Sequence, residues 1–177
     1  MLRLLGLIVV AAGIAGAQGP QYSVGRTPSA EEIRALGATS NPSGVGLPDG
    51  QGTAKEGRDV YELRCKECHG PEGKGADQTG FIGKPEQLMA TPQVRTVGSY
   101  WPYATTLWDY TNRAMPFDRP GTLTADQVYA VTAYILHLNG IVEEDQVMNA
   151  DTLKDVRMPN REGFVPDARP DTGGGAK

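Results

Sequence analysis

The most constraining feature of the sequence is the run Cys65-Lys66-Glu67-Cys68-His69, which holds both cysteines of the 177-residue chain. Two thiols three positions apart can reach both vinyl groups of a porphyrin, and the adjacent imidazole then meets the iron from one face. This run is the attachment pattern of a c-type haem. It predicts one covalently bound haem c, held by Cys65 and Cys68, with His69 as an axial ligand of the iron.

Two other kinds of site use a Cys-x-x-Cys pair, a redox disulfide and a zinc centre. Zinc needs further cysteine or histidine ligands, and His137 is the only other histidine. A thioredoxin-like disulfide needs a strand before the motif, whereas the pattern of residues 54–64 predicts a helix. The glycine-rich run 70–75 lets the backbone pass close to a flat ligand, which neither alternative requires. The context therefore favours haem attachment.

A haem bound by one histidine leaves its second axial position open, or filled by methionine or another histidine. Met115 is the best candidate, because it follows a helix expected at about 103–113 and precedes Pro116, which stiffens the loop. The alternative role of Met115 is core packing, the more common role of methionine. Three further methionines are weaker candidates, one in a segment near the motif and two in a polar tail: Met89, Met148 and Met158.

The last helix is predicted to begin with the capping box Thr124-Ala125-Asp126-Gln127 and to end at Asn139-Gly140. Its apolar positions 128, 131, 135 and 138 share one face. His137 lies away from that face, so it is expected at the surface rather than as a ligand.

The first residues are typical of an export signal. Arg3 supplies a positive charge, residues 4–15 are apolar, and small residues at 15 and 17 place cleavage before Gln18. The alternative is a retained membrane anchor, but the apolar run is shorter than the roughly 20 residues that a spanning helix needs. The mature protein is therefore expected in the periplasm, without stable membrane insertion.

Charge and composition limit the remaining classes. A formal charge of -4 with no basic run excludes a nucleic-acid-binding protein, which needs a positive surface over the phosphates. The 23 glycines and 13 prolines indicate loops and arms around a modest core. One short helix is expected in the N-terminal arm, with Thr27 as its cap and Gly37 as its stop. The expected layout is signal peptide 1–17, N-terminal arm 18–53, haem domain 54–142 and extended C-terminal arm 143–177.

Residues 54–142 resemble a class I cytochrome c, an all-α fold of few helices around one covalently bound haem. In that family an N-terminal helix crosses the last helix through small and aromatic residues. Gly57 and Tyr61 match the first partner of this crossing, and Tyr134 matches the second. The match is physically sound, because a glycine lets two helix axes approach and an aromatic ring fills the space beside it.

A narrower resemblance covers most of the mature chain. It rests on residues 46–53 (GLPDGQGT), 97–106 (VGSYWPYATT), 113–117 (RAMPF), 120–123 (PGTL), 133–140 (AYILHLNG) and 157–164 (RMPNREGF). These segments are similar to SoxD-type cytochromes c, the haem subunits of the molybdenum-containing sulfane dehydrogenase of bacterial sulfur oxidation. They also resemble single-haem cytochromes of sulfite dehydrogenases. SoxD-type proteins commonly carry two haem domains, whereas this chain has one Cys-x-x-Cys-His motif.

The resemblance implies an electron-transfer protein rather than an enzyme. It implies a haem subunit or acceptor of a molybdenum-containing sulfane or sulfite dehydrogenase, with a downstream cytochrome or oxidase as the next partner. The alternatives are a general periplasmic carrier of a respiratory chain, a haem enzyme or sensor with an open iron site, and a docking subunit whose haem is incidental.

Several side chains outside the motif are candidates for contact with the haem. Tyr100 and Trp101 are expected to cover a haem edge and to bond a propionate, with ordinary packing as the alternative. Trp108 is expected to pack in the core. Arg95 and Arg113 are expected at the surface, with neutralisation of a propionate as their alternative role.

Overall fold

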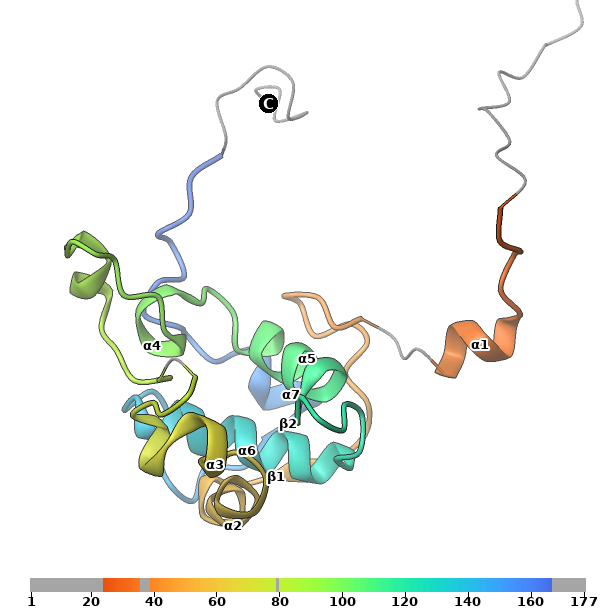
Figure 1. The fold of residues 1–177 in the computed structure, drawn as a ribbon, viewed down its shortest axis with the longest axis horizontal. Coiled ribbons are helices and arrows are strands. Elements are labelled where there is room, and N and C mark those ends of the chain that lie inside the picture. The colour runs from red at the N-terminus through yellow and green to blue at the C-terminus, as the bar shows by residue number, and fades with distance from the viewer. Residues whose placement is uncertain (1–23, 36–38, 79, 167–177) are drawn as a thin grey trace, which may run out of the picture. The chain divides into compact units, whose positions relative to one another are not determined.

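The computed structural model describes residues 24–35, 39–78 and 80–166. The chain divides into two compact units, one containing residues 24–35 and the other containing the described residues from 39 onward (Figure 1). The expected signal peptide 1–17 and the expected helix stop at Gly37 lie outside the described residues. No helix in the described ranges is long and apolar enough to cross a membrane.

The first unit contains the short helix α1 (Ala30–Ala35). Ser29 caps this helix, because the backbone N–H of Glu32 donates to Ser29 Oγ at 3.1 Å and the Glu32 carboxylate accepts from the Ser29 N–H at 2.7 Å. The prediction of Thr27 as the cap is therefore wrong by two residues. The reciprocal bonds of a capping box satisfy two backbone donors at once, and only Ser29 stands three positions before a glutamate that continues the helix.

The regular secondary structure of the second unit is almost all helical, which confirms the predicted all-α class. Its two strands are two residues long and pair antiparallel, with Gln51 opposite Asn149. In chain order the elements are β1 (Gln51–Gly52), α2 (Ala54–Arg64), α3 (Lys66–His69), the 3-10 turns η1 (Pro71–Gly73) and η2 (Pro85–Met89), α4 (Val97–Tyr100), α5 (Ala104–Ala114), α6 (Ala125–Leu138), β2 (Met148–Asn149) and α7 (Ala150–Leu153).

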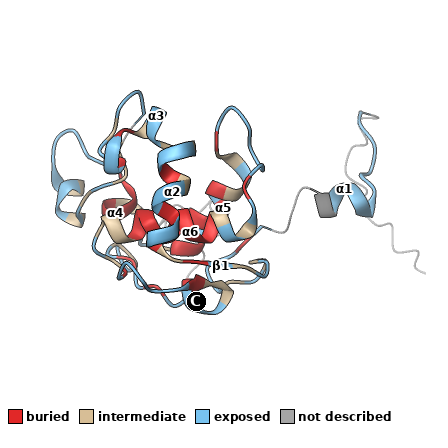
Figure 2. Cartoon of the chain, turned by 90° about the horizontal axis from the view of Figure 1, so that it is seen from below, coloured by how far each residue is buried: buried red, intermediate tan, exposed pale blue. Residues whose placement is uncertain are grey.

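Helix α6 forms the centre of this unit, between α2 and α5 (Figure 1). It begins at the predicted capping box, where Thr124 Oγ1 accepts from the Gln127 N–H at 3.3 Å. Periodicity predicts one apolar face, yet every residue from 128 to 136 is buried, Thr132 included. Figure 2 shows this continuous buried helix among its neighbours. The reason is tertiary, because α2, α4, α5, β1 and β2 cover α6 from several sides.

The predicted crossing of the first and last helices of the haem domain is confirmed. A Cβ on Gly57 would lie 1.9 Å from the carbonyl oxygen of Ala130 and 2.9 Å from Cβ of Tyr134. The Tyr61 and Tyr134 rings fill the adjacent space, with centroids 5.3 Å apart. Glycine therefore allows backbone contact between α2 and α6, and the two rings pack beside it.

The C-terminal residues 148–158 contribute to the core. The fully buried side chains in this segment include Met148, Leu153 and Met158. The description of Met148 and Met158 as part of a polar tail is therefore wrong, because pairing of β2 with β1 folds this segment onto the helices. Beyond it, Phe164 is 50% exposed and Val165 is 85% exposed.

Replacing Gly57 by alanine tests the helix crossing. Alanine usually stabilises a helix interior relative to glycine by about 1 kcal/mol. Here the added methyl group overlaps the Ala130 carbonyl, so we expect a loss of about 1–3 kcal/mol in the free energy of unfolding. Denaturant titration measures this loss.

Asp59→Ala is the matched control, because Asp59 lies on the same helix with an exposed side chain. An unfolding midpoint for Gly57→Ala at or above the wild-type value would contradict the close crossing.

Candidate haem-binding site

The Cys-x-x-Cys-His motif occupies one helical turn that begins where α2 ends. Cys65 is the C-cap of α2, and its N–H donates to the Tyr61 carbonyl at 2.9 Å. The chain then enters α3, where the His69 N–H donates to the Cys65 carbonyl at 3.0 Å. Positions i, i+3 and i+4 of a helical turn share a face. Cys65, Cys68 and His69 therefore lie on one side of this turn, as attachment to a single porphyrin requires.

A helix precedes the motif, so the thioredoxin-like alternative lacks the strand that it needs. Both cysteines are free thiols. Cys65 packs against the hydrophobic core, and burial raises the pKa of its thiol to about 11, whereas Cys68 is exposed. One thiol thus borders the core and the other borders solvent.

The glycine-rich turn after His69 closes tightly on itself. Gly70 has a φ of 74°, and a Cβ there would lie 2.3 Å from the carbonyl oxygen of Gly75. The Gly75 N–H donates to the His69 carbonyl at 2.9 Å, and the buried Tyr61 hydroxyl donates to the Gly70 carbonyl at 2.8 Å. These glycines are therefore required by the turn's own backbone, in addition to any need for space beside a ligand.

Phe81 follows this turn. Its side chain contacts His69, a contact that the motif does not predict. The ring centroids of Phe81 and His69 lie 4.3 Å apart, with an angle of 33° between the planes. Phe81 is also 6.4 Å from the Tyr61 ring, in an edge-on arrangement. The only sequence signal is a lone aromatic residue after a glycine-rich run, and no spacing rule links it to His69.

Met115 lies at the end of α5, where its N–H donates to the Thr111 carbonyl at 3.1 Å. Its side chain is half-buried, and the next residue, Pro116, is buried. The loop that follows α5 and the turn α3 rise on the same side of α6 (Figure 2). The other candidates differ, since Met89 is 89% exposed and the remaining two are core residues. Ligation by Met115 stays a prediction that fits this placement.

Helix α5 carries two buried polar atoms that make no hydrogen bond within the described part of the chain, Thr105 Oγ1 and Trp108 Nε1. Trp108 packs against Tyr129 with ring centroids 5.3 Å apart, as predicted for a core residue. Unpaired buried donors are costly. A haem propionate is a hydrogen-bond acceptor of the kind that these two atoms lack, and the two thiols and the imidazole of residues 65–69 are the groups that attachment of a haem uses.

Tyr100 and Trp101 are half-buried, and both contact other side chains. Tyr100 lies 5.2 Å from the Phe164 ring and 5.3 Å from the Arg95 guanidinium carbon. Trp101 lies edge-on to Tyr110 at 5.8 Å. These contacts hold both rings in place, and their cover of a haem edge stays a prediction.

The remaining candidates have structural partners. Arg113 Nε donates to the Asp109 carboxylate at 3.0 Å, and that buried carboxylate also accepts from the Ser40 N–H at 2.9 Å. His137 is half-buried rather than fully at the surface, and its Nδ1 lies 3.1 Å from the Val142 carbonyl oxygen. These side chains connect elements of the fold.

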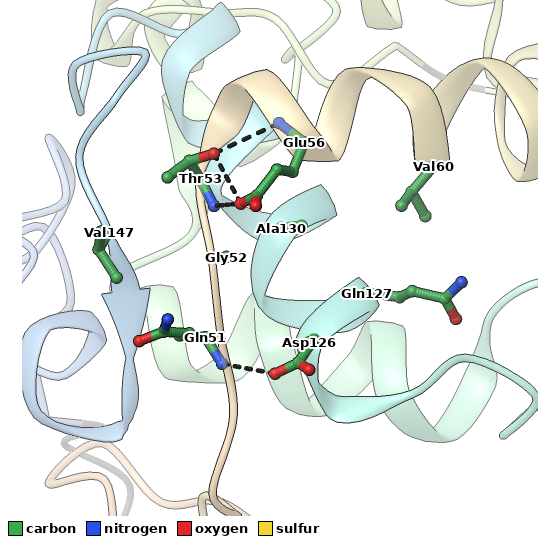
Figure 3. Close-up of a pocket in the computed structure, with 9 residues that line it drawn as sticks. All are labelled: Gln51, Gly52, Thr53, Glu56, Val60, Asp126, Gln127, Ala130 and Val147. Carbon is green, nitrogen blue, oxygen red and sulfur yellow. Dashed lines mark hydrogen bonds between the residues drawn. The ribbon is translucent and has the colours of Figure 1, made fainter.

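A separate pocket of about 420 Å³ lies beside β1, between α2 and α6 (Figure 3). The two carboxylates that line it accept hydrogen bonds from nearby backbone N–H groups. Asp126 accepts from the Gln51 N–H at 2.8 Å, and Glu56 accepts from the Thr53 N–H at 2.8 Å. Among the described residues, no group of three or more His, Cys, Asp or Glu side chains is arranged to hold a metal ion.

Comparison with known proteins gives two matches. Residues 54–139 match the family described as cytochrome c. Among solved structures, the chain is similar to a chain of the sulfane dehydrogenase SoxCD from Paracoccus pantotrophus, with 39% sequence identity and a TM-score of 0.76. That match covers 86% of this chain and 76% of the other. No curated protein sequence matches this chain.

Replacing Tyr61 by phenylalanine tests the bond between α2 and the turn after the motif. The substitution leaves the buried Gly70 carbonyl without its donor, so we expect a loss of about 1–3 kcal/mol in the free energy of unfolding. Tyr110→Phe is the control, because Tyr110 is 48% exposed. Equal stability of the two variants at neutral pH would contradict a structural role for the Tyr61 hydroxyl.

The same variant has a pH signature. Burial raises the pKa of Tyr61 from 10.0 to about 12, so the neutral phenol is favoured in the folded state. The contribution of the Tyr61 hydroxyl to the free energy of unfolding is complete below pH 10, and it falls as the pH rises towards 12. The stability advantage of wild type over Tyr61→Phe should shrink across this interval in denaturant titrations.

Proposed function

The chain belongs to the cytochrome c family, and from this premise we propose that it is an exported monohaem cytochrome that passes single electrons between a sulfur-compound dehydrogenase and a downstream acceptor. The observation that carries the proposal is the single helical turn that brings Cys65, Cys68 and His69 to one face directly after α2. A turn of this kind presents two thioether positions and one axial ligand to the same porphyrin.

Bound there, haem iron supplies a ferric–ferrous couple that takes up and releases one electron. His69 and Met115 would be the two protein ligands of the iron, and together they would exclude exchangeable ligands such as oxygen. A thioether ligand raises the reduction potential relative to harder ligands. The apolar surroundings of Cys65 act in the same direction, because a low dielectric disfavours the additional charge of ferric iron.

The choice of electron donor rests on the similarity to the sulfane dehydrogenase SoxCD, which extends over 86% of this chain and therefore well beyond the haem domain. We take the donor to be a molybdenum-containing dehydrogenase subunit, and the acceptor to be another cytochrome or an oxidase. Export to the periplasm accords with this role, because attachment of haem c and electron transfer to such partners take place there.

The assignment of Met115 is tested on protein matured with a c-type haem attachment system. Intact mass should show one covalently bound haem in both wild type and Met115→Ala. We expect Met115→Ala to lose the sulfur-to-iron charge-transfer absorption, to bind carbon monoxide when reduced, and to have a lower reduction potential.

Met89→Ala is the control for this test, because Met89 is 89% exposed. A wild type without bound haem would end the proposal. An unchanged sixth ligand in Met115→Ala would show that another group holds the axial position.

The exposed end of the C-terminal arm is a candidate contact for the dehydrogenase. Deletion from residue 143 would remove buried core residues such as Leu153, so the informative deletion removes residues 162–177. This deletion takes away the exposed apolar side chains Phe164 and Val165. We expect an unchanged haem spectrum and an affinity for the dehydrogenase about tenfold weaker, measured by titration of the purified partners.

Deletion of residues 167–177 alone is the matched control, since it keeps both apolar side chains. If the longer deletion binds the dehydrogenase as tightly as the full chain does, the arm makes no contact that matters to the complex.

A further inference from the structure

The stacking of Phe81 on His69 is a direct contact with the proposed axial ligand from outside the attachment motif. The ring centroids lie 4.3 Å apart with planes tilted by 33°. Offset stacking of this kind is a favoured geometry between aromatic rings. The contact reaches the imidazole itself, so it bears on how that ligand is oriented.

The position of Phe81 is set by its own surroundings. Its N–H donates to the Gly73 carbonyl at 2.7 Å, and its carbonyl accepts from the Gly98 N–H at 3.4 Å. A Cβ on Gly73 would lie 3.2 Å from Cδ2 of Phe81, so the ring lies directly against the turn. The Tyr61 ring meets it edge-on at 6.4 Å, with an angle of 78° between the planes.

These contacts tie Phe81 to three separate parts of the fold. Gly73 belongs to η1 after the motif, Gly98 lies on α4, and Tyr61 lies on α2 at the helix crossing. The Phe81 ring therefore cannot turn away from His69 without loss of packing against these elements. Its place is therefore set by contacts with residues outside the attachment motif.

We infer that Phe81 is a positioning residue that sets the plane of the His69 imidazole. This inference rests on the proposed role of His69 as an axial ligand. A ring stacked on an imidazole restricts the rotation of that imidazole about its bond to a metal. Groups that orient a ligand in this way also tune the metal that it binds. Phe81 further keeps water away from one face of the imidazole.

The test compares oxidised holoproteins by paramagnetic NMR of the haem methyl groups, whose shift pattern depends on the orientation of the axial imidazole. We expect Phe81→Leu to change the order or spread of these shifts and to lower the reduction potential. Phe81→Tyr retains the ring and should restore both towards wild type. Phe81→Met fills a similar volume without a flat ring, and it should behave as Phe81→Leu does.

Leu153→Ala is the control for a general loss of stability, because Leu153 is fully buried on α7. It should lower the unfolding midpoint and leave the methyl shifts unchanged. If Phe81→Leu and Phe81→Met keep the wild-type shifts and potential while haem is bound, the inference is overturned and the proposed function stands. If wild type itself binds no haem, the proposed function fails, and this inference fails with it.

Discussion

The close crossing of α2 and α6 is the contact on which the rest of the second unit depends. At Gly57 the backbone of α2 meets the carbonyl of Ala130, a separation that no side chain would allow. Because α2 ends at Cys65, this contact also determines where the attachment motif begins. Gly57, in the middle of α2, thus sets the position of the Cys65 thiol relative to the core.

From this crossing, a series of aromatic contacts extends to the proposed axial ligand. Tyr134 packs on Tyr61, Tyr61 meets Phe81 edge-on, and Phe81 stacks on His69. The Tyr61 hydroxyl also binds the Gly70 carbonyl in the turn after the motif. The helix crossing and the site are therefore one packed assembly. A rigid ligand environment suits electron transfer, since little has to rearrange when the charge of the iron changes.

The predicted second ligand, Met115, lies in another part of the fold. Met115 stands at the end of α5, and α5 is held by Asp109, whose buried carboxylate binds both Arg113 and the backbone of Ser40. Residues 148–158 pack their own buried side chains into the same core. A segment before the haem domain thus bonds to α5, and a segment after it packs into the same core. The similarity to a chain of SoxCD likewise covers 86% of the chain, whereas the family match spans residues 54–139.

Local sequence was sufficient for the features that depend on neighbouring residues. The attachment motif, the capping box at Thr124 and the helices around Tyr61 and Trp108 follow from spacing and side-chain chemistry. The glycine in the crossing was predicted from the resemblance to class I cytochromes c. The cap of α1 shows the limit of this reasoning even at short range. Thr27 and Ser29 both carry a hydroxyl that can cap a helix, and the structure has Ser29 in that position.

Contacts between distant segments were decided only by the tertiary structure. Met148 and Met158 lie in a polar stretch of sequence, yet they are buried because β2 pairs with a strand almost a hundred residues earlier. Phe81 reaches His69 through a turn whose shape depends on backbone contacts among glycines. Burial of residues 128–136 of α6 likewise depends on which elements surround the helix. Helical periodicity predicts which single face of a helix is apolar. How many other elements pack against the helix is decided only when the chain folds.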